Sequence, residues 1–252
     1  MTFEYIRSTA LRQSAIDLSC SPDDFCRDES VAVISEPASD ARKYLKLPFF
    51  FELASYGSNA VASCSPEILD FARRFIDRDD IYKCFEPDLL YELNDELAKF
   101  GMRVKYMADY YLPDPGLVDA ALKVNKCRYE LKTLTQTDFS GLYRPEWSNA
   151  LCEARRELDV LGVGAYDGDK LVGLAGCSAD CGEMWQIGVN VLPGYRCQGI
   201  AKAIVTNLAA EIMKAGKVPF YCAAWSNVKS RKCAVASGFR PGWVEITAKP
   251  VE

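Results

Sequence analysis

Residues 189–201 constrain the fold of this chain more than any other stretch. They read Val-Asn-Val-Leu-Pro-Gly-Tyr-Arg-Cys-Gln-Gly-Ile-Ala, which predicts an apolar strand, a turn and the start of a helix. Small residues at 199 and 201, within an Arg-x-x-Gly-x-Ala pattern, let a ligand approach the backbone closely. The free N–H groups and the dipole of a helix N-terminus attract anions. A glycine before a helix more often only allows the chain to turn. The neighbouring segments therefore decide between a simple turn and an anion-binding loop.

The segments around this stretch predict a sheet with helices packed against it. Apolar residues recur every four positions from Ile200 to Ile212, and Gly216 suits the C-terminal cap of that helix. An Asp-Gly pair at 167–168 lies between two apolar runs and predicts a hairpin. The strands expected in this half are residues 127–134, 160–166, 170–177, 184–191, 218–224 and 243–248. The expected helical segments are 135–158, with an interruption at Pro145, the segment from 200, and 226–237.

The first part of the chain predicts a separate α+β unit. Its expected elements are a helix near 9–18, strands at 31–34, 49–54 and 102–110, a hairpin turn at 56–59 into 60–62, and helices after Ser65 and around 89–97. Two prolines and a glycine between Leu112 and Gly116 interrupt both helix and central strand. We therefore predict domains at residues 1–112 and 126–252, with a linker and a short helix at 113–125.

Composition excludes several classes of protein. Hydrophobic residues make up 49% and charged residues 26% of the 252 residues, which are ordinary globular values. There is no apolar run of about 20 residues and no secretory signal pattern at the N-terminus, so we expect a cytoplasmic protein that does not span a membrane. The net charge is −5, and no basic run with interleaved aromatic residues indicates nucleic-acid binding.

Cysteine and histidine usage limits the chemistry of any site. The chain has 11 cysteines without a Cys-x-x-Cys pair, and it has no histidine. This pattern does not fit the usual zinc sites, and we expect no metal. The absence of histidine also excludes a Ser-His or Cys-His nucleophile pair.

Over residues 126–249 the sequence resembles the GCN5-related N-acetyltransferase (GNAT) superfamily in three features. The strand ending at Val191 and residues 193–201 are similar to the family's acetyl-CoA loop, in which Arg or Gln is followed by x-x-Gly-x-Gly or x-x-Gly-x-Ala. The second feature is residues 225–230, which follow a strand. The third is Gly238-Phe239, which ends the helix that begins near Asn227. The order and spacing of all three carry the resemblance.

The resemblance implies an α/β (α+β) fold, with a mixed, mostly antiparallel central sheet flanked by helices. It also implies that acetyl-CoA is the donor substrate and that its pyrophosphate binds at the helix N-terminus. The residues implied to bind acetyl-CoA are Val189, Val191, Arg196, Cys197, Gln198, Gly199, Ile200, Ala201, Asn227 and Ser230. On the residues alone, Asn227 can also be only a helix cap and Ser230 only a small surface residue.

The catalytic residues are less well defined. The resemblance implies direct attack of an amine on the acetyl group, and an ammonium with a pKa near ~10 must first lose a proton. Many members carry a carboxylate in the middle of the strand before the loop. Here Glu183, at the start of that strand, is the nearest candidate, and its alternative is a plain surface carboxylate. Many members also place a general-acid Tyr where this chain has Ala234, so Tyr221 or Cys222 is a candidate replacement.

We therefore expect an acetyl-CoA-dependent N-acetyltransferase that acts on a small-molecule amine. One alternative is a protein or peptide N-acetyltransferase, because the acidic first half could attract basic peptides. The other is an acyl-CoA-binding module without activity. A closed or open pocket beside Gln186 and Asn190 would discriminate between small and large acceptors.

The C-terminus leaves one structural question open. Family members often have two strands after Gly-Phe, whereas only one fits here after Phe239. The other strand could come from the N-terminal unit or from a second subunit of a homodimer, or it could be absent. A related hypothesis is that the N-terminal unit is a degenerate copy of the same fold.

Overall fold

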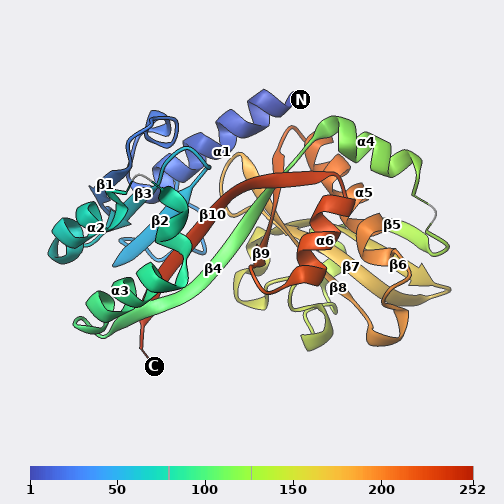
Figure 1. Ribbon diagram of the computed structural model, residues 1–252. Helices are drawn as coiled ribbons and strands as arrows, with labels where there is room; N and C mark the ends of the chain where they lie inside the picture. Colours follow the sequence, from blue (N-terminus) through green and yellow to red (C-terminus); the bar gives the residue numbers. More distant parts are fainter. Residues whose placement is uncertain (79, 126, 252) are drawn as a thin grey trace. The chain divides into compact units, whose positions relative to one another are not determined.

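The computed structural model describes residues 1–78, 80–125 and 127–251 (Figure 1). The chain divides into two compact units. Unit 1 comprises residues 1–9, 111–223 and 227–241, and unit 2 comprises residues 10–110, 224–226 and 242–251. The domain boundaries expected from the sequence stay a prediction, and residues 126 and 252, which delimit the second domain, lie outside the described residues.

Unit 1 is built on a mostly antiparallel sheet. Its strands lie in the order β9-β8-β7-β6-β5. Their bounds are β5 (Glu130–Thr135), β6 (Asp159–Asp167), β7 (Lys170–Ser178), β8 (Met184–Val191) and β9 (Val218–Ala224). Neighbours are antiparallel except β8 and β9, which are parallel. The helices are α4 (Pro115–Lys123), α5 (Ile200–Lys214) and α6 (Val228–Ala236), drawn in green, orange and red-orange in Figure 1.

The core of unit 1 lies between this sheet and α5. The periodic apolar face of α5, with Ile204 and Leu208 fully buried, packs against Val172 and Ile187 of the strands. The helix ends before Gly216, whose φ of +75° is the left-handed conformation that a C-cap glycine adopts. The mixed α/β fold expected from the resemblance is confirmed, and β8 and β9 have the expected bounds.

The helical region expected at 135–158 does not form an α-helix. The segment contains only short 3₁₀ turns: η4 (Gln136–Phe139), η5 (Pro145–Trp147) and η6 (Glu153–Leu158). The capping box between Thr135 and Asp138 does form. Pro145 then occupies the first position of a new turn, where its missing N–H is not needed, and it prevents the first turn from continuing.

The turn at 112–116 differs from the expected break. Strand β4 (Met102–Pro113) continues through Leu112 and ends on its proline. Asp114 then caps α4 by accepting from the N–H groups of Gly116 and Leu117 at 3.0 and 3.2 Å. Proline is tolerated at the end of a strand and at the first position of a helix, so the two prolines mark a direct strand-to-helix junction.

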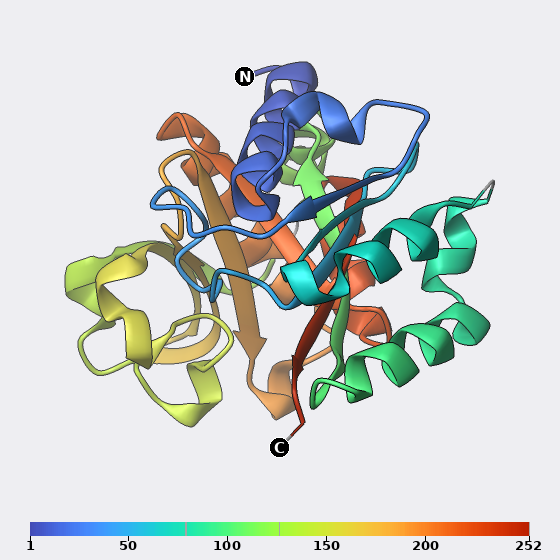
Figure 2. The same cartoon turned by 90° about the vertical axis from the view of Figure 1, so that its left-hand side faces the viewer.

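In unit 2 the strands lie in the order β1-β3-β2-β10-β4. The remaining bounds are β1 (Val31–Ile34), β2 (Phe51–Ser55), β3 (Val61–Cys64), β10 (Phe239–Pro250), α1 (Phe3–Leu18), η1 (Pro22–Phe25), η2 (Pro66–Ile68), α2 (Leu69–Ile76), η3 (Ile81–Phe85) and α3 (Pro87–Ala98). Leu53 packs with Phe75 of α2 and Leu93 of α3, whereas its neighbour Ala54 packs with Leu11 of α1. Successive strand residues face opposite sides, so α1 covers one face of β2, and α2 and α3 cover the other (Figure 2).

The last strand answers part of the question left by the sequence. A single strand, β10, follows Gly238, and its residues Val244–Thr247 pair antiparallel with Ser55–Glu52 of β2. The end of the chain therefore pairs with a strand from the N-terminal half. The hypothesis that unit 2 is a degenerate copy of the first fold stays a prediction.

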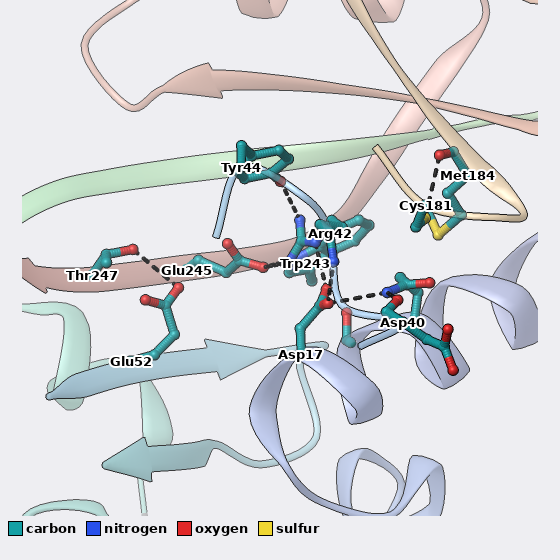
Figure 3. A network of polar contacts seen from close by, with 12 residues as sticks. Asp17, Asp40, Arg42, Tyr44, Glu52, Cys181, Met184, Trp243, Glu245 and Thr247 are labelled. Carbon is teal, nitrogen blue, oxygen red and sulfur yellow. Dashed lines mark hydrogen bonds and ion pairs between the residues drawn. The ribbon is translucent and has the colours of Figure 1, made fainter. Parts of the chain in front are cut away.

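Unit 2 buries a network of charged groups around Arg42 (Figure 3). Arg42 is 3% exposed and forms ion pairs with Asp17 and Glu245. Its Nη1 donates to the hydroxyl of Tyr44 at 2.7 Å, and Trp243 Nε1 donates to the same Glu245 carboxylate at 2.7 Å. Removal of the arginine would leave two buried carboxylates without their shared cation.

Across the described part of the chain, no helix has both the length and the apolar character needed to cross a bilayer.

Candidate functional site

Unit 1 contains a cavity of about 550 Å³ where the end of β8, the N-terminus of α5 and the helix α6 meet. Val189, Asn190 and Val191 line one side of it, and Tyr221 of β9 lines another. The residues before and at the start of α5 close one end.

The backbone of β8 presents polar groups to this cavity. The Leu192 N–H donates to the Val172 carbonyl at 3.0 Å, and β7 and β8 are antiparallel with Gly173 opposite Val191. In an antiparallel ladder only alternate residues bond to a given neighbour. Residues 188, 190 and 192 therefore bond to β7, and the N–H and C=O groups of Val189 and Val191 face the side of β9.

On that side the pairing stops early. The parallel ladder between β8 and β9 runs from Met184–Val218 to Ile187–Tyr221, although both strands continue further. Beyond Ile187 the edge of β8 opens onto the cavity, and the carbonyl of Val191 accepts from Arg196 Nε at 3.1 Å. The N–H and C=O of Val189 and the N–H of Val191 are thus placed to pair with an extended ligand, as an added strand would.

The turn before α5 forms an anion-binding concavity. Cys197 and Gly199 adopt left-handed φ values of +61° and +79°, a conformation that is unusual for a cysteine. The first helical bond runs from the Ala203 N–H to the Gly199 carbonyl, so the N–H groups of residues 200–202 have no acceptor within the helix. Nothing lies within 4 Å of a Cβ built on Gly199. These N–H groups, with the helix dipole, suit a phosphate or pyrophosphate.

The cavity wall carries positive charge. Arg196, Lys202, Lys229 and Lys232 line it. Among the described residues that line the cavity there is no aspartate or glutamate. The cavity therefore suits an anionic ligand.

Tyr221 and Ser230 form a hydroxyl pair in the cavity wall. Their oxygens lie 2.8 Å apart, and Tyr221 is 3% exposed. Burial raises the pKa of Tyr221 far above its usual value, while its hydrogen bond to Ser230 lowers it, so the phenol is protonated at neutral pH. Tyr221 can donate a hydrogen bond or a proton there, and it cannot act as a base.

A segment from the loops before β6 supplies the remaining wall at Asn149. Asn190 Oδ1 accepts from the backbone N–H groups of Asn149 and Ala150, both at 2.9 Å. A Cβ on Gly188 would lie 1.7 Å from the Asn149 carbonyl oxygen, and one on Gly176 would lie 2.2 Å from that of Ala150. The two glycines are paired residues of β7 and β8. Because neither has a side chain, the backbone of this segment can lie directly against the sheet.

Asp159 holds the two ends of the same segment. Its Oδ2 accepts from the Cys152 N–H at 2.8 Å, and it is hydrogen-bonded to the hydroxyl of Tyr143. Burial raises the pKa of Asp159 from 3.8 to about 6, and the bonds from Cys152 and Tyr143 partly oppose that rise. Below about pH 6 this carboxyl is mostly protonated in the folded chain.

The structure brings together all the predicted acetyl-CoA residues except one. Those that line the cavity are Val189, Val191, Arg196, Cys197, Gly199, Ile200, Ala201, Asn227 and Ser230. Gln198 Oε1 instead accepts from Arg128 Nη2 at 2.8 Å and from the Tyr129 hydroxyl at 2.7 Å, which braces the loop from outside. Asn227 also caps α6 by accepting from the Ser230 N–H, so the cap interpretation holds whether or not Asn227 binds a ligand.

The predicted catalytic residue is not brought to the cavity. Glu183 is exposed and precedes β8, and its carbonyl accepts from the Val218 N–H. At ~3.3 Å per residue, it lies roughly 20 Å along the strand from Val189. Of the two candidate proton donors, Tyr221 lines the cavity, whereas Cys222 accepts a hydrogen bond from Gln186 Nε2 at 3.2 Å.

Sequence reasoning missed several cavity residues. Lys229 and Lys232 are one turn apart on α6, and Lys202 is in the first turn of α5, so helical spacing next to the loop could have indicated all three. Asn149 precedes β8 by a long stretch of chain and has no local signal of its own.

Comparisons with known proteins identify the family of one part of the chain. Residues 128–239 match the model of the acetyltransferase (GNAT) family. A comparison with curated proteins found no match. Residues 128–239, less than half of the chain, are therefore a GNAT acetyltransferase domain, of a family that transfers acyl groups.

Three solved structures are also similar to this chain. A GCN5-related N-acetyltransferase from Kribbella flavida has 16% identity over 78% of this chain and 82% of that chain, with a TM-score of 0.48. A GCN5-related N-acetyltransferase-like protein from Streptococcus suis has 20% identity over 68% and 76%, with a TM-score of 0.45. A GNAT-family acetyltransferase from Colwellia psychrerythraea has 18% identity over 57% of each chain, with a TM-score of 0.43.

Proposed function

We propose that the protein is an acetyl-CoA-dependent N-acetyltransferase that transfers the acetyl group to a small-molecule amine by direct attack. One observation carries the proposal: a single cavity joins an open backbone edge of β8 to the anion-binding turn at the start of α5. A ligand with an extended amide arm and a pyrophosphate fits these two features together.

The fit to acetyl-CoA follows from the residues present. The N–H groups at the start of α5 would hold the pyrophosphate, and Arg196 and Lys202 would add charge. Val189 and Val191 would pair with the amides of the pantetheine arm. When bound, acetyl-CoA supplies an activated acetyl thioester.

The chain's own residues would orient the donor and manage protons. Backbone N–H groups on the open edge of β8, fixed in direction, suit the developing negative charge on a carbonyl oxygen. The Tyr221 hydroxyl, protonated and paired with Ser230, would donate to the leaving thiolate. Since no carboxylate occurs among the described residues of the cavity wall, we propose that the amine loses its proton to water.

Substitutions at Gly199 test the donor site. Gly199→Glu places a carboxylate where the pyrophosphate would lie and should weaken acetyl-CoA binding, measured by calorimetry, at least 100-fold. The matched control is Gly199→Ala. Any residue with a Cβ at a φ of +79° has the same backbone strain of roughly 1–2 kcal/mol, but alanine does not add the negative charge of glutamate. Equal affinities of the two variants, or no acetyl-CoA binding by the unmodified protein, would overturn the proposal.

A second candidate function is an acyl-CoA-binding module without transferase activity. The position of Glu183 outside the cavity and Ala234 in place of the family's tyrosine favour it. Acetyl-CoA binding without release of free CoA in the presence of a broad amine panel would select this candidate. Acetylation of peptides but not of small amines would select the protein or peptide acetyltransferase instead.

We further propose a cytoplasmic location, which fractionation of cells expressing the chain would check. A homodimer stays a prediction, and light scattering of the purified protein would test it.

A further inference from the structure

Two carboxamide side chains, Asn149 and Asn190, line the cavity beside the proposed acetyl site. Asn190 follows Val189 directly on β8. Asn149 comes from the segment that rests on Gly188. Neither belongs to the turn that would hold the phosphates.

The hydrogen bonds of Asn190 fix which of its atoms is available. Its Oδ1 accepts from two backbone N–H groups, those of Asn149 and Ala150. A backbone N–H can only donate, so the bonded atom must be the oxygen and not the amide nitrogen. Within the described residues Nδ2 has no hydrogen-bond partner, so its two N–H groups are available to a ligand.

The position of this amide is rigid. The Asn149–Ala150 segment lies so close to β7 and β8 that a Cβ at Gly176 or Gly188 would overlap its carbonyl oxygens. The segment and the Asn190 side chain therefore hold each other in place. A donor fixed in this way costs little ordering entropy when a ligand oxygen binds to it.

Charge narrows the class of acceptor further. Arg196 and Lys202 would face the pyrophosphate, and among the described lining residues there is no aspartate or glutamate to receive a cationic group of the acceptor. A diamine would bring a second positive charge without a counter-charge to receive it. An acceptor with a carbonyl or carboxylate oxygen next to its amine would instead satisfy the Asn190 donors.

We infer that the acceptor is a small amine with an adjacent carbonyl or carboxylate oxygen, as in a free amino acid or its amide, and that Asn190 Nδ2 recognises this oxygen. This inference rests on the proposed function. Asn190 thereby determines specificity, and Asn149 completes the wall of the acceptor subsite.

Matched acceptors test this inference. Each pair contains an amino acid amide and the amine that lacks its carboxamide, for example leucinamide with isopentylamine and phenylalaninamide with phenethylamine; putrescine is the diamine. CoA release, with kcat/KM expressed per concentration of unprotonated amine so that the lower pKa of the amides does not contribute, should be at least ten-fold more efficient for the amide in each reacting pair. The value for putrescine should be lower than that for either monoamine. Equal or reversed values would overturn the inference.

Variants separate recognition from positioning. Asn190→Asp keeps an oxygen for the two backbone N–H groups but removes the Nδ2 donors, so the amide-to-amine preference should fall at least ten-fold, mostly through KM. Asn190→Ala also releases the segment and should raise KM for both members of a pair. Asn207→Asp, on α5 outside the cavity, adds the same charge and should leave the preference unchanged. An unchanged preference in Asn190→Asp would refute the role of Nδ2.

Acetyl-CoA affinity, measured separately by calorimetry, distinguishes failure of the proposed function from failure of this inference. If acetyl-CoA binds but no acceptor reacts, ligand-observed NMR on the acetyl-CoA complex can compare the binding of the amide and the amine in each pair. Preferential binding of the amides would support the inference, and equal binding would overturn it.

Discussion

Gly188→Ala should detach the Asn149–Ala150 segment from the sheet. The added Cβ would lie 1.7 Å from the Asn149 carbonyl oxygen, which is backbone and cannot rotate away as a flexible side chain would. Overpacking of this kind costs about 1–3 kcal/mol. Loss of the two Asn190 hydrogen bonds adds about 1 kcal/mol each. We therefore expect a decrease of about 3–5 kcal/mol in the free energy of unfolding.

Urea unfolding measures this loss, with Gly182→Ala as the matched control. Gly182 has open space around a built Cβ and no left-handed φ, so its substitution should change stability by less than about 0.5 kcal/mol. Amide hydrogen exchange gives the local readout: the N–H groups of Asn149 and Ala150 should lose protection in Gly188→Ala. If both variants unfold at the same urea concentration, the segment does not rest on the sheet as described.

The double variant with Gly176→Ala sharpens the test. Both glycines contact the backbone of the same segment. Once one substitution has displaced this segment, the second substitution should lower the free energy of unfolding by little more. The double variant should therefore be clearly less destabilised than the sum of the two single variants. Full additivity would mean that the two glycines act independently, and it would refute the claim that both hold the same segment against the sheet.

Two further predictions concern buried charge. Arg42→Met should destabilise the chain by about 3–5 kcal/mol, because it leaves Asp17 and Glu245 buried without their cation, whereas Arg73→Met, at an exposed ion pair, should cost less than about 0.5 kcal/mol; equal urea midpoints would contradict this. The pKa of Asp159 is raised to about 6 in the folded chain, so the folded state binds its proton more tightly than the unfolded state. The stability that this proton contributes is complete below about pH 4 and is lost as pH rises through 6. The unmodified protein should thus lose on the order of 2–3 kcal/mol relative to Asp159→Asn between pH 4 and 8, and parallel pH profiles would refute this.

Local patterns were sufficient for the elements that carry their own signals. The alternation of 184–191 and the four-residue period after Ile200 gave β8 and α5 with the bounds observed. These two elements also set the donor side of the site, because the strand, the turn and the helix N-terminus are continuous in sequence. Most of the predicted acetyl-CoA residues consequently meet in one cavity.

The helical region expected at 135–158 failed because its signals were only local. Thr135 and Asp138 do form a capping box, but a cap needs a following periodic apolar face to extend into a helix. The segment instead makes short turns, and Phe139 and Trp147 from two of them are buried in one apolar cluster with Leu174 of β7. Tertiary packing, not propensity, decided its conformation.

The proposed acceptor side of the site depends on contacts between distant parts of the chain, but the sequence contains an indication of it. A glycine inside a strand weakens it, since there is no side chain to pack, and often marks a close approach of another backbone. Here Gly176 and Gly188 are partners in adjacent strands, and both approach carbonyls of residues 149–150. Asn190, two residues beyond Gly188 on the same face, binds the N–H groups of that same segment. Two glycines that pair across adjacent antiparallel strands, followed by an amide at the next position on their face, thus indicate where a loop crosses the sheet and which side chain holds it there.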